Sequence, residues 1–492
     1  MSYKINAFPP TIKIDFVKSP LVIIFVSIYI IISVSLYNHI TLSYSSFAKL
    51  YQRLMKPKHI LFLLPEFPIL GGMEKITAGV AGKLAERGHR VTIYAAKPTQ
   101  SEVNIPLNDL ITLHYTGNWK DRSEEAQKLI EYLHQEKVDI IINESLVSSP
   151  VTDVLEIVRE QTHIHVIQVY HGMPRVTYHR PRAENEGVRY KRLIKSIFWP
   201  LYCIRNQKRY VRDIRRVLQC SDIMVVLSPE FIENIYEIAG SEFLNSLKDK
   251  SHGHQSHSKV VCIPNFVEYL PQTGGVQGDV QEDVWEDVKD DVEEDMYRGA
   301  AGFAKRENRI IYCGRIRENQ KRVLRVLRIW ERTAPLFPDW ELDLIGDGPD
   351  MKRYKRYVRK RGIERVNFRG YISRPREMMY GSKILLLTSD HEGMGLVVAE
   401  AQLSGCVPVI YNSFATASHL IESGKDGLLI PPFEEDKFIR GLHRLMQSPE
   451  ELDRMSRNAE ENREKYDPAG IVDKWEEIIC AVTSSSPREQ TD

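Results

Sequence analysis

The feature that most constrains this chain of 492 residues is a run of 28 residues, Ile384 to Tyr411. It opens with an apolar segment, Ile384–Leu387, which has the length of a buried strand. A helical pattern extends from Leu396 to Ser404, Gly405 is a suitable end for it, and a second apolar segment follows at Val407–Tyr411. This order predicts one strand–loop–helix–strand unit of a parallel α/β sheet.

The loop of this unit reads Glu392-Gly393-Met394-Gly395. Parallel sheets bind ligands at the carboxyl ends of their strands, where this loop falls. The two glycines allow a close approach of the backbone, and free amides at a helix start bind phosphate. Glu400 follows Glu392 with seven residues between them, so both carboxylates can face one ligand. In isolation such a spacing also arises by chance, from a loop glutamate and a solvated helix glutamate.

The whole stretch resembles the Glu-x7-Glu signature of retaining glycosyltransferases with the GT-B fold, in the family-4 group. The resemblance implies an α/β protein of two Rossmann-like domains facing across a cleft, with a nucleotide-sugar donor bound between them. It implies that Gly395 and Leu396 face the diphosphate, that Glu392 contacts the donor sugar, and that Glu400 contacts the ribose hydroxyls.

A basic pair follows the first predicted strand of the second domain, Arg309–Cys313. Arg315 and Lys321 are suited to clamp a diphosphate, because charge-assisted bonds to phosphate are strong and Arg makes them in pairs. The family carries a basic pair at this place, and Arg322 is a candidate to share the role. The alternative is that these are solvated loop cations.

A later strand, Val366–Tyr371, ends at Tyr371-Ile372, which resembles the region that packs the nucleotide base in this family. The resemblance also implies transfer on the front face of the sugar, with basic residues and the helix dipole replacing a metal. No Asp-x-Asp motif ends a predicted strand. We therefore expect no metal and no cofactor, since the nucleotide sugar is a substrate.

The first domain is predicted to begin with a βαβ unit: strand His59–Leu64, helix Glu74–Glu86 and strand Arg90–Ala95. Gly71 and Gly72 lie in its turn, but without Gly-x-Gly-x-x-Gly a dinucleotide site is unsupported. The resemblance places both glycines at the cleft, near the donor phosphate and the acceptor. A plain strand-to-helix turn is the alternative.

Three further short strands are predicted in this domain, at Val138–Ile142, His165–Tyr170 and Ile223–Leu227. His171 follows the second of them, where family members carry a histidine or an acid close to the reacting sugar. The competing interpretation of His171 is an ordinary hydrogen-bonding loop residue. Val260–Glu268 resembles the end of the first domain.

Charge is segregated along the chain although the net charge is only +1. Between Arg189 and Arg216 ten Lys and Arg residues face one Asp, among apolar and aromatic residues. This composition fits the surface of a membrane with anionic lipids. Nucleic acid is the rival partner, but no nucleic-acid-binding motif supports it. A solvated basic face over a core stripe is the third interpretation.

An acidic segment, Asp279–Asp295, carries ten acidic residues within the predicted linker. Like charges at this density disfavour a stable isolated helix, so we interpret it as an insertion without a catalytic role. The six cysteines lie far apart and form no Cys-x-x-Cys pair. That spacing suits a reducing compartment and argues against a disulfide framework or a structural zinc site.

The first 54 residues contain an uncharged, mostly apolar run of 17 residues, Leu21–Tyr37. At about 1.5 Å per residue it would be about 25 Å long, nearly a bilayer core, so it is a candidate transmembrane helix. Flanking Lys and Arg residues slightly favour a cytoplasmic catalytic part. A cleaved signal peptide lacks its usual cleavage site here. Translation from Met55 would instead give a cytoplasmic protein.

The sequence thus predicts a retaining glycosyltransferase that moves a sugar from a nucleotide-sugar donor to a glycan or lipid-linked acceptor in surface polysaccharide synthesis. A nucleotide-sugar epimerase and a non-catalytic sugar-nucleotide-binding protein remain alternatives. Two last helices are expected, Glu434–Gln447 and Asp467–Val482, and a return of the second one to the first domain is an open alternative. The chain is predicted to divide into an N-terminal segment (1–54), an acceptor domain (55–270), an acidic linker (271–308), a nucleotide-sugar domain (309–480) and a disordered tail (481–492).

Overall fold

The computed structural model describes residues 56–68, 72–97, 107–174, 199–250, 259–267, 305–372 and 374–484. The described residues from Lys58 onward belong to one compact unit. The candidate transmembrane segment Leu21–Tyr37, Gly71 and the acidic segment Asp279–Asp295 lie outside the described residues. Within the described ranges, no helix is both long enough and apolar enough to cross a membrane.

The first sheet has seven strands, and every neighbouring pair is parallel. Its order is β3-β2-β1-β4-β5-β6-β7. Apolar runs of three or more residues occur in most of these strands, as expected where both faces of a parallel sheet are covered. The strands are β1 (His59–Glu66), β2 (Arg90–Ala96), β3 (Ile111–Thr116), β4 (Ile140–Asn143), β5 (His165–Tyr170), β6 (Ile223–Val226) and β7 (Val260–Cys262).

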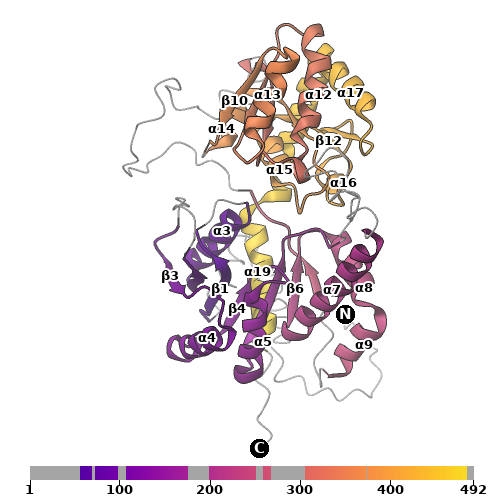
Figure 1. Ribbon diagram of the computed structural model, residues 1–492. Helices are drawn as coiled ribbons and strands as arrows, with labels where there is room; N and C mark the ends of the chain where they lie inside the picture. Colours follow the sequence, from indigo (N-terminus) through magenta and orange to yellow (C-terminus); the bar gives the residue numbers. More distant parts are fainter. Residues whose placement is uncertain are drawn as a thin grey trace, which may run out of the picture. The chain divides into compact units, whose positions relative to one another are not determined.

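Alternate residues of β1 face the two helical layers of this sheet, because side chains along a strand point to opposite faces. Ile60 and Phe62 belong to the core with α3 (Gly72–Glu86) and α19 (Pro468–Thr483). Leu61 and Leu63 belong to the core with α4 (Arg122–Glu136) and α5 (Pro150–Thr162) (Figure 1). The remaining helices of this part are α7 (Trp199–Cys220), α8 (Pro229–Ala239) and α9 (Ser241–Lys250).

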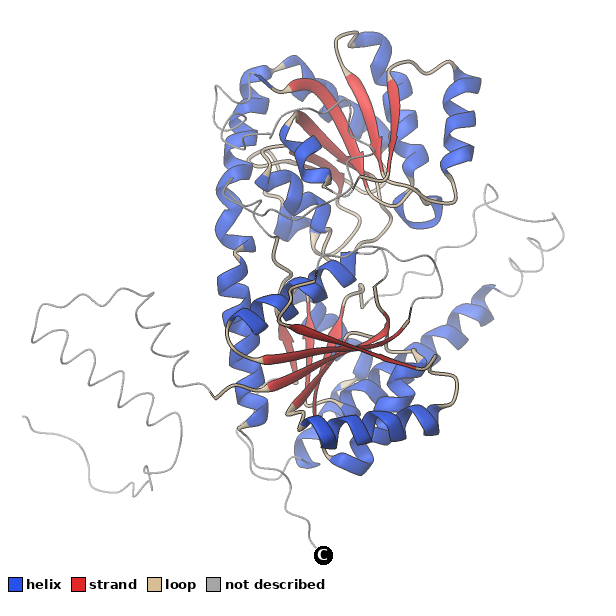
Figure 2. Ribbon diagram, turned by 90° about the vertical axis from the view of Figure 1, so that its left-hand side faces the viewer, coloured by secondary structure: helices blue, strands red, loops and turns tan. Residues whose placement is uncertain are grey.

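The second sheet has six parallel strands in the order β10-β9-β8-β11-β12-β13. Helices again cover its two faces (Figure 2). One core packs α12, α13 and α17 on the sheet, and the other packs α14 and α15. The elements are β8 (Glu307–Cys313), α11 (Glu318–Lys321), α12 (Val323–Thr333), β9 (Glu341–Ile345), α13 (Met351–Arg361), β10 (Val366–Gly370), α14 (Pro375–Tyr380), β11 (Ser382–Leu387), α15 (Leu396–Leu403), β12 (Val407–Tyr411), α16 (Ala417–Leu420), β13 (Leu428–Ile430), α17 (Glu435–Gln447) and α18 (Pro449–Glu460).

The predicted pair of parallel α/β sheets is confirmed, and strands β5 and β12 have the predicted bounds. The prediction of only two final helices is wrong, because α18 lies between α17 and α19. In addition, α19 packs in the core of the first sheet, the alternative that the sequence left open beside the assignment of residues up to 480 to the second domain. Its apolar residues, such as Trp475 and Ile479, pack on the same face of the first sheet as α3 does.

Each sheet reverses its strand order at one place, between β1 and β4 in the first and between β8 and β11 in the second. The chain leaves such strands in opposite directions, so the loops after them part and leave room for a ligand. The segments after β1, β4, β8 and β11 are therefore where a site is expected.

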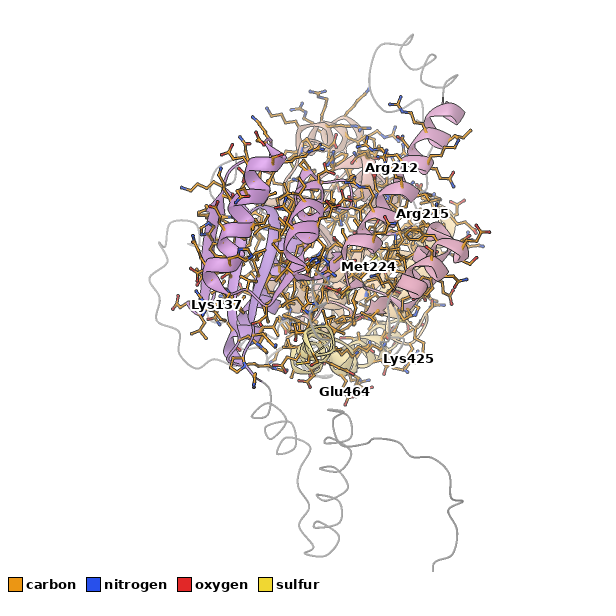
Figure 3. The ribbon with its side chains drawn as sticks, turned by 90° about the horizontal axis from the view of Figure 1, so that it is seen from below. Lys137, Arg212, Arg215, Met224, Lys425 and Glu464 are labelled. Atoms are coloured by element: carbon orange, nitrogen blue, oxygen red, sulfur yellow. The ribbon has the colours of Figure 1, made fainter. Side chains whose placement is uncertain are left out.

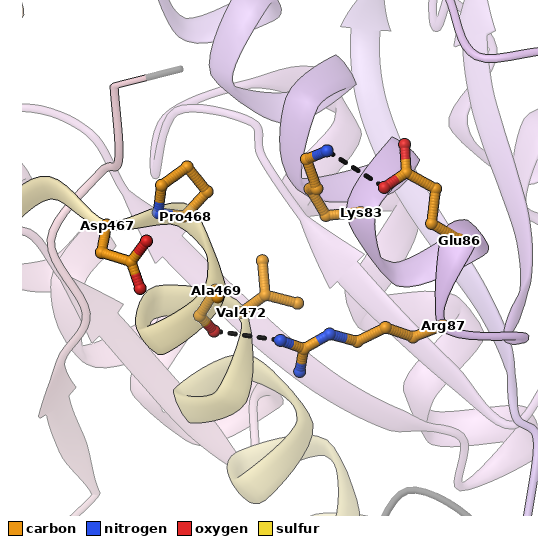
Figure 4. Close-up of a pocket in the computed structure, with 7 residues that line it drawn as sticks. All are labelled: Lys83, Glu86, Arg87, Asp467, Pro468, Ala469 and Val472. Atoms are coloured by element: carbon orange, nitrogen blue, oxygen red, sulfur yellow. Dashed lines mark hydrogen bonds and ion pairs between the residues drawn. The ribbon is translucent and has the colours of Figure 1, made fainter. Parts of the chain in front are cut away.

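A cluster of mostly buried ion pairs joins α19 to the segment between α3 and β2. Arg87, which follows α3, donates to Glu476 Oε2 at 2.6 Å and contacts Asp473 at the same distance. His89 Nε2 lies 3.3 Å from Glu476 Oε1. Arg87 also donates to the carbonyl of Ala469 beside a hollow of about 500 Å³ (Figure 4).

The pKa of Glu476 is lowered: burial alone would raise it, but the hydrogen bonds from His89 and Arg87 outweigh burial. A lowered pKa stabilises the folded state above the carboxyl's unfolded pKa of about 4.3, and this contribution is lost as the pH falls through the folded pKa. We expect Glu476→Gln to lower the free energy of unfolding by about 2 kcal/mol at neutral pH.

Thermal denaturation of both proteins at pH 7 and near pH 4 tests this expectation. The difference in Tm between wild type and Glu476→Gln should shrink at the lower pH. Glu477→Gln, one residue along and exposed, is the matched control and should leave Tm unchanged. A difference that does not depend on pH would contradict the role of this carboxylate.

Candidate functional site

The glutamate loop, Thr388–Gly395, follows β11 and is anchored by Asp390. This carboxylate is buried and accepts bonds from Arg322 Nε at 2.6 Å and Arg325 Nη1 at 2.7 Å. The amide of Asp390 donates to the carbonyl of Gln320 at 2.9 Å. Arg322 therefore helps to position this loop through its Nε, and its share in a phosphate clamp stays a prediction.

Lys321 and Glu392 form an ion pair in the middle of the site. Lys321 Nζ lies 2.7 Å from one carboxylate oxygen of Glu392 and 2.9 Å from the other. The Glu392 side chain is only 8% exposed and that of Lys321 19% exposed. Two residues 71 positions apart are thus brought together because β8 and β11 are neighbours.

Arg315 lies two residues after the end of β8 and is exposed. Its carbonyl accepts a bond from the Tyr312 hydroxyl at 3.0 Å, which fixes the backbone and leaves the guanidinium at the surface. Burial raises the pKa of Glu74 in α3, and the charge of Arg315 is among the smaller effects that oppose this rise.

Helix α15 begins directly after the glutamate loop. Gly395 caps it with φ at +76°, a left-handed conformation that favours glycine. Leu396 is the first helical residue. An added Cβ on Gly72, at the start of α3, would lie 3.9 Å from Leu396 Cδ1, so the predicted site residues Gly72 and Leu396 are neighbours.

Glu400 lies about one turn into α15 and is half-buried. Burial raises the pKa of this carboxyl, and the charges of Arg376 and Lys75 partly oppose that rise. Lys75 belongs to α3, so a cation of the first sheet's helix acts on a carboxylate of the second. Neither Lys75 nor Arg376 was predicted as a site residue, and no motif marks them in the sequence.

On the first sheet, His171 follows β5 and pairs with Glu144, which follows β4. The Glu144 side chain is 3% exposed and that of His171 13% exposed. The sequence prediction named His171 but missed Glu144 and the buried Glu74. The sequence did offer a signal for Glu144: like His171, it is a polar residue directly after a short, mostly apolar strand.

A buried amide network holds the ends of β4 and β5 behind this pair. Asn143 Nδ2 donates to Gln168 Oε1 at 2.7 Å. Gln168 Nε2 in turn donates to the carbonyls of Asn143, Ser145 and Val169 at 2.8–3.1 Å. Because every polar atom in this network has a partner, the two strand ends are held in one arrangement.

The glutamate loop touches the segment that follows β5, and the contact is between Gly393 and His171. An added Cβ on Gly393 would lie 2.2 Å from the carbonyl oxygen of His171, closer than any side chain allows. Asn265, beyond β7, also donates its amide to Met394 Sδ at 3.2 Å. The structure therefore brings His171, Gly72, Glu392 and Leu396 to one place, where the loops of the two sheets touch.

Tyr371 and Ile372 follow β10, which is separated from β11 by the two strands β9 and β8. Tyr371 is 49% exposed, so its ring is accessible to a ligand. Ile372 is partly buried against the core that contains Cys406 and Ala401 of α15. Among the residues that the structure describes, no three His, Cys, Asp or Glu side chains are grouped so that they could hold a metal ion.

Two family models match the chain. The model described as Glycosyltransferase Family 4 matches residues 70–237, and the model described as Glycosyl transferases group 1 matches residues 293–462. The first match covers most of the first sheet and its loops, and the second covers the second sheet. Together they span the larger part of the chain and include the glutamate loop.

Similar proteins and structures include glycosyltransferases. The lipopolysaccharide 1,6-galactosyltransferase of Salmonella typhimurium is 32% identical over 28% of this chain and 39% of its own length. The amylovoran biosynthesis glycosyltransferase AmsD of Erwinia amylovora is 26% identical over 36% of this chain and 49% of its own length. The chain thus matches less than half the length of these curated relatives.

Among solved structures, Anabaena HepE in complex with UDP-glucose is similar in fold, with a TM-score of 0.59 at 14% identity. The similarity covers 86% of this chain and 99% of HepE. At this identity the likeness shows the fold alone, which is that of two parallel α/β domains.

Proposed function

The chain belongs to the GT-B glycosyltransferases of the group 1 and family 4 type, and we propose that it transfers a sugar from a nucleotide-sugar donor to a glycan or lipid-linked acceptor. The observation that carries this proposal is the Lys321–Glu392 pair. It lies after neighbouring strands at a switch point, directly before the amides of α15. Phosphate binding needs the cation and the amides, and sugar hydroxyls need the carboxylate.

We assign the residues by the chemistry that each one offers. Lys321, Arg315 and the amides of Gly395 and Leu396 bind the diphosphate, Glu392 binds hydroxyls of the donor sugar, and Glu400 binds the ribose. Tyr371 and Ile372 pack the base. His171, held by Glu144, lies against the glutamate loop and therefore close to the reacting sugar. Gly72 leaves room for the substrate at the start of α3.

We further propose that transfer retains the anomeric configuration. The bond from the anomeric carbon to the diphosphate oxygen breaks, and the acceptor oxygen bonds to that carbon on the same face. The acceptor proton passes to the leaving diphosphate, whose growing charge is stabilised by Arg315, Lys321 and the loop amides. In this scheme cations supplied by the protein replace a metal, and no cofactor takes part.

The relatives act in the synthesis of lipopolysaccharide and amylovoran, so we propose a related role in surface polysaccharide synthesis. We also propose that the chain is membrane-associated with its catalytic part in the cytoplasm, where nucleotide sugars are made. The apolar segment Leu21–Tyr37 and its flanking cations support this location. Resistance of full-length protein to extraction by alkali, with release by detergent, would test it.

An assay across UDP-, GDP- and ADP-sugars tests the function. We expect slow release of nucleoside diphosphate from one donor class, faster release with an acceptor, and a product whose anomeric proton coupling matches that of the donor. Activity should persist in EDTA. Activity lost to EDTA and restored by Mn²⁺ or Mg²⁺ would contradict the metal-independent scheme.

The same assay separates the alternatives. An epimerase would interconvert free sugar nucleotides without an acceptor. A non-catalytic sugar-nucleotide-binding protein would bind a donor and release nothing, and that outcome would contradict the proposed transfer.

A further inference from the structure

Helix α7 has one buried face and one cationic face. Ile214, Val217 and Leu218 are fully buried in the core that also contains Phe231 and Ile235 of α8. On the opposite face, at intervals of three to four residues, are the exposed side chains Ile204, Lys208, Arg212 and Arg215. Over its described part, the basic segment therefore combines an exposed cationic face with a buried apolar stripe.

This outer face is hollowed. Together with Phe243 of α9, it lines a groove of about 620 Å³. No acidic residue is among its lining residues, which are Ile204, Gln207, Lys208, Val211, Arg212, Arg215, Arg216, Gln219 and Phe243. We call this set the α7–α9 groove; Arg212 and Arg215 are labelled on α7 in Figure 3.

The cations of the groove differ in how far their charge is compensated. Arg216 is bonded to Asp153 and Glu156, so it belongs to the fold. Arg212 contacts Asp213 at 3.0 Å, which is the one acidic residue among six Lys and Arg residues in α7.

Arg215 donates to the carbonyl of Ala239 and lies 5.3 Å above the Phe243 ring, so its charge meets no carboxylate in these contacts. Lys208 is exposed on the same face. The groove therefore carries a net positive charge that is accessible from solvent.

Apolar side chains lie between these cations. Ile204 is 52% exposed, and Val211 and Phe243 are half-buried in the groove wall. An acidic protein or a free phosphate needs only the cations. A lipid surface uses both kinds of side chain, because headgroup phosphates bind the cations while the apolar groups enter the interface.

We propose that the α7–α9 groove docks the chain onto an anionic lipid surface. Lys208, Arg212 and Arg215 bind headgroup phosphates, and Ile204, Val211 and Phe243 contact the interfacial region of the bilayer. This contact is independent of the Leu21–Tyr37 segment and of the transfer reaction.

Sedimentation of full-length protein with vesicles tests the proposal. Sedimentation with vesicles of phosphatidylcholine alone measures the binding that does not depend on lipid charge, which includes any binding through the N-terminal segment. Adding phosphatidylglycerol should increase wild-type binding, and salt should reverse the increase. In Lys208→Glu/Arg212→Glu we expect the gain from phosphatidylglycerol to fall at least about twentyfold, since each cation near an anionic surface contributes about fivefold.

The matched control is Lys352→Glu/Arg356→Glu on the exposed face of α13, which changes the net charge equally. It should bind anionic vesicles as wild type does. If Lys208→Glu/Arg212→Glu lowers Tm, the variant Lys208→Gln/Arg212→Gln replaces it, because it removes the two charges without adding carboxylates. This variant should also lose most of the increase in binding that phosphatidylglycerol causes. Binding to phosphatidylcholine alone should be the same in all variants.

Three outcomes would overturn the proposal: wild-type binding that ignores phosphatidylglycerol, a groove variant that binds like wild type, or an equal loss in the α13 control. A fourth is displacement from vesicles by an equimolar peptide with the sequence of Asp279–Asp295. That result would assign the groove to the chain's own acidic segment.

Discussion

Lys321→Ala is expected to lower kcat/KM for sugar transfer by about 10²–10³-fold, the effect of removing one preorganised donor from a developing oxyanion. The ammonium is mostly buried and is bonded to Glu392, four residues before the start of α15, so its interaction with a diphosphate is poorly screened by water. The substitution also leaves Glu392 buried without its cation. Transfer rates with saturating and limiting donor would separate kcat from KM.

Arg315→Ala tests the same assignment without disturbing the buried pair, because Arg315 is exposed. We expect kcat/KM to fall by as much as in Lys321→Ala or less, since solvent screens the charge of the exposed Arg315 more than that of the mostly buried Lys321. Lys352→Ala, at an exposed lysine of α13, is the control for the loss of one positive charge. Wild-type transfer by both Lys321→Ala and Arg315→Ala would show that the donor diphosphate binds elsewhere.

Glu392→Gln is expected to have two opposite effects. Sugar transfer should fall about 10²-fold or more, because the amide cannot accept hydrogen bonds from donor hydroxyls at both of its terminal atoms. Affinity for free nucleoside diphosphate should instead rise, by about tenfold. The reason is that Lys321 is bonded to both oxygens of Glu392, and a diphosphate must compete with a charge-assisted bond worth about 1.5–3 kcal/mol.

Calorimetric titration with UDP, GDP and ADP measures this affinity. Glu400→Gln is the informative comparison, because Glu400 interacts with Arg376 and Lys75 rather than holding the Lys321 ammonium. If Glu400 binds the ribose, its substitution should weaken nucleotide binding. Equal weakening by Glu392→Gln would contradict the competition, and wild-type transfer by that variant would remove Glu392 from the sugar site.

Local sequence was sufficient to predict most of the strands and two of the candidate site's carboxylates, Glu392 and Glu400, but not Glu144 or Glu74. Apolar runs such as His59–Leu64 and Ile384–Leu387 bury both faces of a strand wherever they pack, so their pattern predicts a parallel sheet before any contact is known. The spacing from Glu392 to Glu400 likewise depends only on a loop followed by a helix. Strand β3 has polar residues at partly exposed positions, and it was missed for that reason.

The partners of those residues were decided by tertiary structure alone. Lys321 meets Glu392 because β8 and β11 are adjacent, and Glu144 meets His171 because β4 and β5 are adjacent. Strand order is set by how helices cover both faces of a sheet, which no local pattern records. The return of α19 to the first sheet has the same cause: an amphipathic helix packs on whichever apolar face the folded chain leaves uncovered.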